Sequence, residues 1–279
     1  MNVTADLQRF AEMVTRDQFD LVEASLLVAQ DAYPDLDVGA VQAAIERMAD
    51  VVKARLPADA FAEQRIQALN HHLFDELGFN GNSDDYFDPR NSYLNDVLER
   101  RTGIPITLSI LYMELARRIG LDAHGISFPG HFMVRIHVSR GQLILDPFNR
   151  AEPQSIADLR QRLAKVLPKA VAEQAPLDPY LAIATPRDII ARVLRNLKNI
   201  HSKSGQIESA LAVMNRLLLV VPESAEELRD RGMLYRRLDC FRPALSDLQN
   251  YLRRRPQAPD AIDVRTAIVE LQHAAMRLH

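Results

Sequence analysis

The sequence of 279 residues has no tryptophan and a single cysteine, Cys240. One cysteine excludes an intramolecular disulfide framework and a zinc site built from several thiolates. No apolar run approaches the roughly 18 to 20 residues that span a bilayer as a helix. The N-terminal segment has an early acidic residue and no basic flank before an apolar block, so we expect no secretory signal. These absences predict a soluble protein of the reducing cytoplasm without a membrane partner, in which Cys240 is a packed or idle thiol.

Net charge is also small, at −3, but it is unevenly distributed. Residues 1–100 carry 19 acidic side chains and 8 lysines or arginines, whereas residues 186–279 carry 11 and 16. The acidic first part argues against nucleic acid as a partner, because phosphates are bound by clustered basic residues. The mildly basic last part is read as a solvated helical surface that could also contact an acidic partner.

Helical periodicity dominates residues 1–78. Amphipathic helices are predicted over 38–56 and 60–77, and Gly78 is the expected C-terminal stop of the second. The loop that follows, residues 79–93, combines turn-forming residues with Tyr86 and Phe87, an unusual aromatic content for a solvated loop. It is predicted either to wrap the core or to form the wall of a cleft.

The central stretch 103–149 predicts a helix followed by three short strands. The helix covers 105–119, and Pro105 is tolerated in its first turn because the missing N–H would have no partner there. Strands are expected at 123–128, 131–138 and 142–145. In the second strand, buried positions alternate with a polar face formed by His131, Met133, Arg135 and His137. Helices packed on a small antiparallel sheet give an α+β fold.

His131 opens the second predicted strand and Asp146 closes the third. Antiparallel neighbours could bring the two side chains within hydrogen-bonding distance, and an aspartate that orients a histidine is typical of hydrolytic sites. The helix before them carries no cysteine. Thr107 and Ser109 are the nearest hydroxyls that could serve as a nucleophile.

No metal or cofactor site is predicted. His131 and His137 lie six residues apart on one expected strand, roughly 20 Å at about 3.3 Å per residue, so they cannot share a metal ion. The adjacent His71 and His72 point about 100° apart on a helix. No glycine-rich phosphate motif follows a strand.

Residues 150–185 are punctuated by prolines around one short helix, which Ser155 and Asp158 would cap, and they predict a packed linker. From residue 187 onward, helical segments repeat at a spacing of 34 residues. The repeated positions are Leu194 and Leu228, Ala210 and Ala244, Leu211 and Leu245, Leu218 and Leu252, and Pro222 and Pro256. Two helices per unit, with a small alanine at their crossing, resemble the tetratricopeptide repeat. Gly232 and Tyr235 match its pattern in the second unit, and a last helix over 260–278 would cover the final apolar face.

Three motifs precede the repeats in a specific order: NSYLNDVLERRTGIPITLSILYMELARRIGL, GISFPGHFMVRI and LILDPFN. With them, essentially the whole chain resembles the SirB-type family, a transglutaminase-like region followed by tetratricopeptide repeats. The resemblance implies a mainly helical N-terminal region with a small antiparallel sheet of transglutaminase/papain type, then an all-α repeat region, in a cytoplasmic bacterial setting. The transglutaminase-like domain would cover 1–185, with N-terminal helices at 1–78, a core at 92–149 and a linker at 150–185. The repeat domain would cover 186–279. The resemblance also implies that Pro105 lies at or next to the position of the nucleophilic cysteine.

Three functions are open at this point. The preferred one is a non-catalytic scaffold or regulator that binds a protein or peptide in a cleft between helix 105–119 and the sheet. Besides the His131–Asp146 pair, that cleft would be lined by Tyr86, Phe87, Asn91, Arg135 and Asn149. The second is a hydrolase or acyltransferase in which the pair activates Thr107, Ser109 or water. In the third, His131 and Asp146 have a purely structural role.

Overall fold

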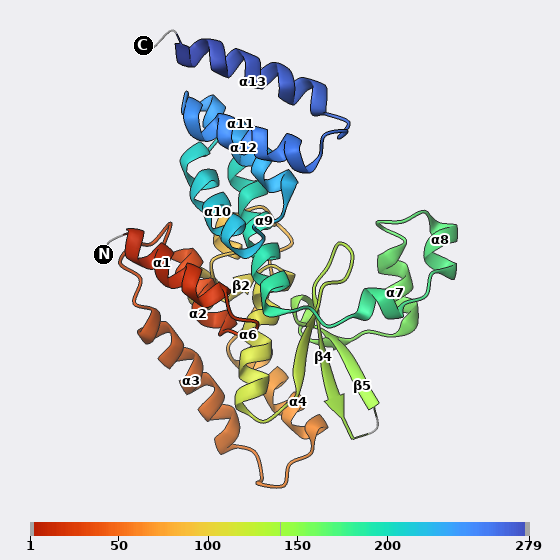
Figure 1. The fold of residues 1–279 in the computed structure, drawn as a ribbon. Helices are drawn as coiled ribbons and strands as arrows, with labels where there is room; N and C mark the ends of the chain where they lie inside the picture. Colours follow the sequence, from red (N-terminus) through yellow and green to blue (C-terminus); the bar gives the residue numbers. More distant parts are fainter. Residues whose placement is uncertain (1–2, 140, 277–279) are drawn as a thin grey trace. The chain divides into compact units, whose positions relative to one another are not determined.

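The computed structural model describes residues 3–139 and 141–276. The chain divides into two compact units, Met1–Asn196 and Leu197–His279, and helix α9 (Pro186–Lys203) runs across the division. Helices dominate both units, and in the described residues the strands belong to the first (Figure 1). The predicted α+β fold class is therefore confirmed. In the described part of the chain, no helix has both the length and the apolar character needed to cross a bilayer.

Helices form the first part of the first unit. They are α1 (Val3–Val14), α2 (Leu21–Ala29), α3 (Val38–Ala54), α4 (Ala62–Asn70) and α5 (Leu94–Arg100). Helices α2 and α3 begin after Asp20 and Asp37, whose carboxylates accept hydrogen bonds from backbone N–H groups of the first turn. Helix α2 is buried along most of its length because it contacts α1, α3 and α5.

Helix α4 continues directly into a π-helical turn, η1 (His71–Glu76), where the sequence predicts one uninterrupted helix. Within this turn, Nδ1 of His72 lies 2.6 Å from a carboxylate oxygen of Glu76. Arg55 donates to the other oxygen at 2.7 Å. Gly78 has a φ of 74° and ends the segment, as expected for a glycine stop.

Glu76 gives the first unit a defined acid sensitivity. Its hydrogen bonds with His72 and Arg55 lower the pKa of the carboxyl group from 4.5 to about 2. The unfolded chain therefore takes up this proton at higher pH than the folded chain. The stabilisation is complete above about pH 4.5 and is lost as the pH falls toward about 2. We expect Glu76→Gln to lose less stability than wild type between about pH 5 and about pH 3. Thermal unfolding at the two pH values measures this difference.

The matched control for this prediction is Glu63→Gln, in the exposed first turn of α4. It should keep the wild-type dependence on pH. An unchanged acid dependence in Glu76→Gln would contradict the prediction.

Helix α6 (Pro105–Arg118) lies at the centre of the first unit, between the N-terminal helices and the sheet (Figure 1). Nearly all of its side chains are buried. It contacts α2, α3 and α4 on one side and the sheet on the other. Gly120, with a φ of 78°, follows the helix end, next to the predicted last residue, 119.

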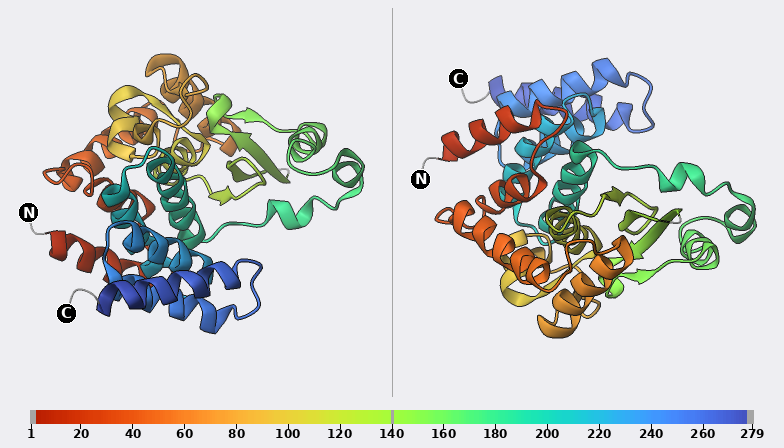
Figure 2. Two further views of the ribbon diagram at one scale, coloured as in Figure 1. Left: turned by 90° about the horizontal axis from the view of Figure 1, so that it is seen from above. Right: turned by 90° about the horizontal axis from the view of Figure 1, so that it is seen from below.

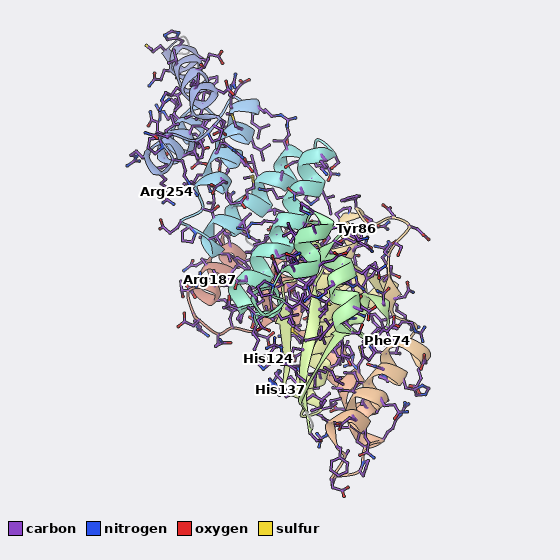
Figure 3. The ribbon with its side chains drawn as sticks, turned by 90° about the vertical axis from the view of Figure 1, so that its right-hand side faces the viewer. Phe74, Tyr86, His124, His137, Arg187 and Arg254 are labelled. Carbon is purple, nitrogen blue, oxygen red and sulfur yellow. The ribbon has the colours of Figure 1, made fainter. Side chains whose placement is uncertain are left out.

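The main sheet is antiparallel and has the order β3-β4-β5-β6. Its strands are β3 (Ala123–Ile126), β4 (Met133–Val138), β5 (Gly141–Asp146) and β6 (Glu152–Pro153). His124 on β3 and His137 on β4 lie near each other on these neighbouring strands (Figure 3). A second, parallel pair joins β1 (Asn80–Gly81) to β2 (Thr102–Gly103).

Two expectations for β4 are wrong. His131 lies outside the strand, because a turn in which its N–H donates to the carbonyl of Phe128 precedes Met133. Met133, expected on a polar face, is fully buried. It packs in a cluster with Leu159, Leu163 and Ala172, so this end of the sheet is covered on the face that alternation assigned to solvent.

The segment 150–185 holds more structure than the single predicted helix. It forms α7 (Ile156–Leu163), α8 (Lys169–Gln174) and a 3₁₀ turn, η4 (Asp178–Leu181). Ser155 and Asp158 cap α7 reciprocally, as expected. Figure 2 shows α7 and α8 beside the sheet, on the side away from the N-terminal helices. The residues expected to form a linker therefore belong to the first unit.

The second unit begins within α9 and continues through four further helices. They are α10 (Ile207–Val220), α11 (Ala225–Arg237), α12 (Phe241–Arg254) and α13 (Ala261–Met276). The repeated Ala210 and Ala244 are both fully buried. A Cβ atom at Gly232 would lie 2.9 Å from the side chain of Leu248, so the close approach of α11 and α12 requires glycine.

The first repeat differs from the second at the position equivalent to Gly232, where it carries Lys198. The Lys198 ammonium group lies 2.6 Å from a carboxylate oxygen of Glu227 and 3.0 Å from one of Asp230, both on α11. At this position, the first repeat therefore makes a charged contact between α9 and α11, whereas the second makes a close packing contact between α11 and α12.

Candidate functional site

His131 and Asp146 are in direct contact. Nε2 of His131 lies 2.8 Å from Oδ1 of Asp146, and the two side chains are 11% and 0% exposed. Asp146 is the last residue of β5, and His131 lies just before β4, so the antiparallel pairing of these strands brings them together. The other ring nitrogen, Nδ1, has no hydrogen-bond partner among the described residues.

The carboxylate of Asp146 accepts further hydrogen bonds. Arg162 and Asn149 donate to Oδ2 at 2.5 and 2.6 Å, and the backbone N–H of Phe148 donates to Oδ1 at 3.2 Å. Burial alone would raise the pKa of Asp146. The hydrogen bond and charge of His131, the charge of Arg162 and the hydrogen bond from Asn149 outweigh that effect, so the pKa lies below its ordinary value. Asp146 is therefore ionised near neutral pH, and its charge is shared between His131 and Arg162.

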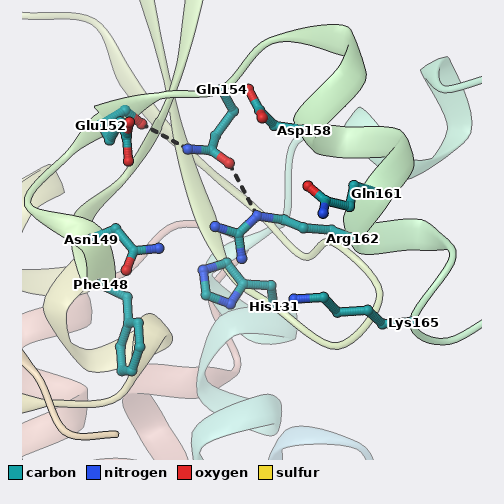
Figure 4. A pocket seen from close by; sticks show the side chains of 9 residues that line it. All are labelled: His131, Phe148, Asn149, Glu152, Gln154, Asp158, Gln161, Arg162 and Lys165. Atoms are coloured by element: carbon teal, nitrogen blue, oxygen red, sulfur yellow. Dashed lines mark hydrogen bonds between the residues drawn. The ribbon is translucent and has the colours of Figure 1, made fainter.

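A cavity of about 400 Å³ opens beside this pair (Figure 4). It is lined by His131, Phe148, Asn149, Glu152, Gln154, Asp158, Gln161, Arg162 and Lys165. Gln154 holds the Arg162 guanidinium in place, because its Oε1 accepts from Nε of Arg162 at 3.0 Å. The lining offers carboxylates, amides and cations around one aromatic ring, which suits a polar ligand.

An aromatic row leads away from the cavity. The ring of Phe148 lies 5.9 Å from that of His131 and 6.4 Å from that of Tyr86, measured between centroids. The ring of Phe87 follows at 5.5 Å from Tyr86. Tyr86 and Phe87 are 39% and 65% exposed, so two of the predicted binding residues form an open apolar surface next to the site.

The N-terminus of α6 holds the residues considered as nucleophiles. Pro105 is the first helical residue and is buried. The hydroxyl of Thr107 donates to the carbonyl of Asn91 at 2.7 Å and accepts from the N–H of Ile104 at 3.2 Å. Ser109 is fully buried, and its hydroxyl has no hydrogen-bond partner among the described residues. Neither hydroxyl lines the cavity beside His131.

Comparison with known families extends this picture. Residues 39–195 match the family model described as "Transglutaminase-like superfamily", and residues 197–268 match that of the "Tetratricopeptide repeat". The chain belongs to the transglutaminase-like superfamily. A "UPF0162 protein" of Xylella fastidiosa (strain Temecula1) is 37% identical over 95% of each chain. A "UPF0162 protein" of Vibrio cholerae serotype O1 is 30% identical over 92% of this chain and 94% of that one.

These matches confirm the resemblance drawn from the sequence motifs, a transglutaminase-like region followed by tetratricopeptide repeats. Among solved structures, the crystal structure of menin matches 97% of this chain and 70% of its own, at 12% identity and a TM-score of 0.44. Similarity at that level transfers no property of menin to this transglutaminase-like protein.

Two other predicted binding residues are engaged in the transglutaminase-like scaffold. Asn91 is fully buried, and its amide donates to the carbonyl of Asp85 at 2.7 Å and accepts from Asn82 at 3.1 Å. Arg135 donates to the carbonyl of Leu181. Neither side chain lines the cavity, whereas Asn149 does.

Sequence reasoning missed the part of the cavity that α7 contributes. Gln161 and Arg162 lie three and four residues after Asp158 on α7, so the three share one face, and Lys165 follows just beyond the helix end. The helical spacing of these polar residues can be recognised in the sequence. Their position against β5 cannot be predicted from it, because that position depends on how the segment 150–185 folds back over the sheet.

Proposed function

We propose that the transglutaminase-like region is a non-catalytic binding module and that the protein acts as a scaffold or regulator that holds a protein or peptide segment. One observation carries the proposal: the His131–Asp146 pair borders an open polar cavity, while Pro105 begins the helix that would present a thiol. A thiol at a helix N-terminus is stabilised as the reactive thiolate. Without it, the pair can hold a ligand but cannot form an acyl intermediate with a cysteine.

The chemistry of the cavity favours an extended polar segment. Arg162 and Lys165 line the cavity together with Glu152 and Asp158, so the lining carries both signs of charge and can also bind backbone amides. The exposed rings of Tyr86 and Phe87 would hold apolar side chains next to the cavity. A peptide chain carries both kinds of group.

The tetratricopeptide unit is proposed to contact a protein partner of its own. Stacked helix pairs of this type form extended surfaces that bind other chains. A partner bound by the second unit and a peptide held by the first would be linked through one chain, which is the property of a scaffold.

A second candidate function is hydrolysis or acyl transfer by an activated water molecule. The observation that favours it is the orientation of His131 by Asp146, which leaves Nδ1 without a partner among the described residues. A general base held in this way can deprotonate a bound water. The two candidates differ in one measurable outcome, which is whether a bound peptide leaves the cavity chemically unchanged.

Lys165→Ala tests the binding proposal. We expect the purified chain to retain peptides from a random library, with their masses unchanged in mass spectrometry. For a retained peptide that carries an acidic residue, loss of the Lys165 ammonium group should weaken binding about tenfold, equivalent to about 1.4 kcal/mol. Titration by fluorescence anisotropy measures this change.

Lys169→Ala is the matched control. This lysine lies four residues further on, is highly exposed and does not line the cavity, so its removal should leave the affinity unchanged. Retained peptides whose affinity is the same in both variants would show that they bind elsewhere. Peptides that emerge cleaved or acylated by wild type but not by His131→Gln would establish the enzymatic candidate instead.

A further inference from the structure

Three side chains that can ligate a metal ion gather on one face of the main sheet. The register of β3 and β4 pairs His124 with Arg135, and the N–H of His137 donates to the carbonyl of Asp122 at 3.2 Å. Side chains alternate between the faces of a strand, so Asp122 and His124 share one face. His137, opposite Asp122, shares it too. Figure 3 shows the two histidines close together.

The distances between their ligand atoms are short. Oδ1 of Asp122 lies 2.7 Å from Nε2 of His124, and Oδ2 lies 2.8 Å from Nδ1 of His137. One ligand atom from each residue falls within 4.8 Å of the others. Bonds of about 2.0–2.2 Å to a tetrahedral ion place ligand atoms roughly 3.4 Å apart. Small side-chain rotations would therefore bring all three onto one ion.

We propose that Asp122, His124 and His137 form a binding site for a divalent transition-metal ion of the zinc class. Two imidazole nitrogens and one carboxylate oxygen suit Zn²⁺, whereas Mg²⁺ and Ca²⁺ prefer oxygen ligands alone. Three protein ligands leave further coordination positions for water or for a group from another molecule.

Solvent reaches the three side chains, as metal uptake requires. The side chains of Asp122, His124 and His137 are 63%, 37% and 50% exposed. Nε2 of His124 and Nδ1 of His137 lie 2.7 and 2.8 Å from the carboxylate oxygens, and metal binding requires these two nitrogens in the unprotonated form. The remaining nitrogens, Nδ1 of His124 and Nε2 of His137, have no hydrogen-bond partner among the described residues. A neutral ring can therefore hold its one proton at that remaining nitrogen.

A cation also lies on this face, but it is tied elsewhere. Arg135 is directly opposite His124, and its guanidinium donates to the carbonyl of Leu181 in η4. This contact fixes the charge on the backbone of a different segment. The Asp122 carboxylate contacts the two histidines and has no arginine or lysine partner among the described residues, so it is available to an ion.

The site is separate from the cavity beside His131. Toward that end of the sheet, the same face carries Ile126 and Met133, which are buried in the cluster that includes α7 and α8. The three proposed ligands lie on the uncovered part, and none of them lines the cavity. The proposed metal site therefore does not depend on the proposed binding function, and each can be tested without the other.

Zinc titration of the full chain tests this inference. The protein is stripped with a chelator and titrated with zinc sulfate by isothermal calorimetry, with folding of each variant checked by circular dichroism. We expect one equivalent of zinc to bind. His124→Gln and His137→Gln should each weaken binding about tenfold or more, because each removes one of three ligands while keeping a polar side chain at the position.

His71→Gln is the matched control, since His71 is an exposed histidine with carboxylates of Asp75 and Glu76 at 3.0 and 3.4 Å. Long-range ¹H–¹⁵N spectra of the histidine rings add a second readout. Zinc should shift Nε2 of His124 and Nδ1 of His137. The inference is overturned if wild type takes up no zinc, or if a His124→Gln/His137→Gln double variant binds as wild type does.

Discussion

Replacement of Asp146 by alanine is expected to destabilise the first unit by about 3–5 kcal/mol, the cost of breaking a buried charged pair from one side. Asp146 is fully buried and accepts hydrogen bonds from His131, Arg162, Asn149 and a backbone N–H. Alanine would leave the partly buried Arg162 cation without its carboxylate. Guanidinium-induced unfolding followed by far-UV circular dichroism measures the loss, and hydrogen exchange assigns it to the first unit.

Two further variants separate the causes. Asp84→Ala removes an exposed aspartate from loop 79–93 and should change stability by less than about 0.5 kcal/mol. Asp146→Asn keeps the size and one acceptor oxygen but removes the charge, so it should fall between the other two. If Asp146→Ala costs less than about 1 kcal/mol, the site is held together by other contacts and the structural role of the pair is refuted.

Leu248→Ala is expected to destabilise the second unit by about 2–5 kcal/mol, the range for a buried leucine whose removal leaves a cavity. Leu248 is fully buried on α12 in a cluster with Ala244, Tyr251 and Ile268. Its side chain also lies against Gly232 of α11, which has no side chain to fill the space left behind. Thermal unfolding and hydrogen exchange of α11 and α12 would report the loss.

Leu219→Ala on α10 is the control with identical chemistry. Leu219 is 36% exposed, so less apolar surface returns to water and no closed cavity forms. A loss in Leu248→Ala no larger than that in Leu219→Ala would contradict the prediction. Because the chain has two units, the two transitions should be fitted separately rather than as one two-state process.

Helix ends, helix caps and repeat positions of this fold can be predicted from the sequence because they depend on nearby residues. Gly78 and Gly120 end helices where the sequence predicts it, since both adopt a positive φ that other residues avoid. Ser155 and Asp158 form the expected capping pair. The repeat spacing places Ala210 and Ala244 at buried crossings, because the same small residue recurs in each unit.

Contacts between segments that are distant in the sequence could not be predicted from it. Met133 reads as part of a polar face because nothing in its strand shows that α7 and α8 cover that end of the sheet. Arg162 reaches Asp146 from a segment that reads as a linker. The proximity of His124 and His137 follows from a strand register that spacing along one strand does not reveal.

In the candidate site, too, some contacts could be predicted from the sequence and others could not. The order of helix, histidine and aspartate identifies His131 and Asp146 as possible partners, because consecutive antiparallel strands are adjacent. Whether Asn91, Thr107 or Arg135 reaches a ligand depends on which backbone groups require their hydrogen bonds. In this fold, the carbonyls of Asp85, Asn91 and Leu181 take up those donors.

The loop that carries Tyr86 and Phe87 is closed at its base. Asn80 and Gly81 pair in parallel with Thr102 and Gly103, so the two ends of the segment between them are fixed to each other. Asn91 ties the inner part of this segment to backbone carbonyls. A loop with fixed ends gains little entropic cost from a few added residues at its tip. We therefore expect that the loop can be lengthened, and the side chains of Tyr86 and Phe87 exchanged, without unfolding the helices and sheet behind them. Under the proposed binding function, ligand preference would diverge through a few exposed positions while the buried framework stays constant.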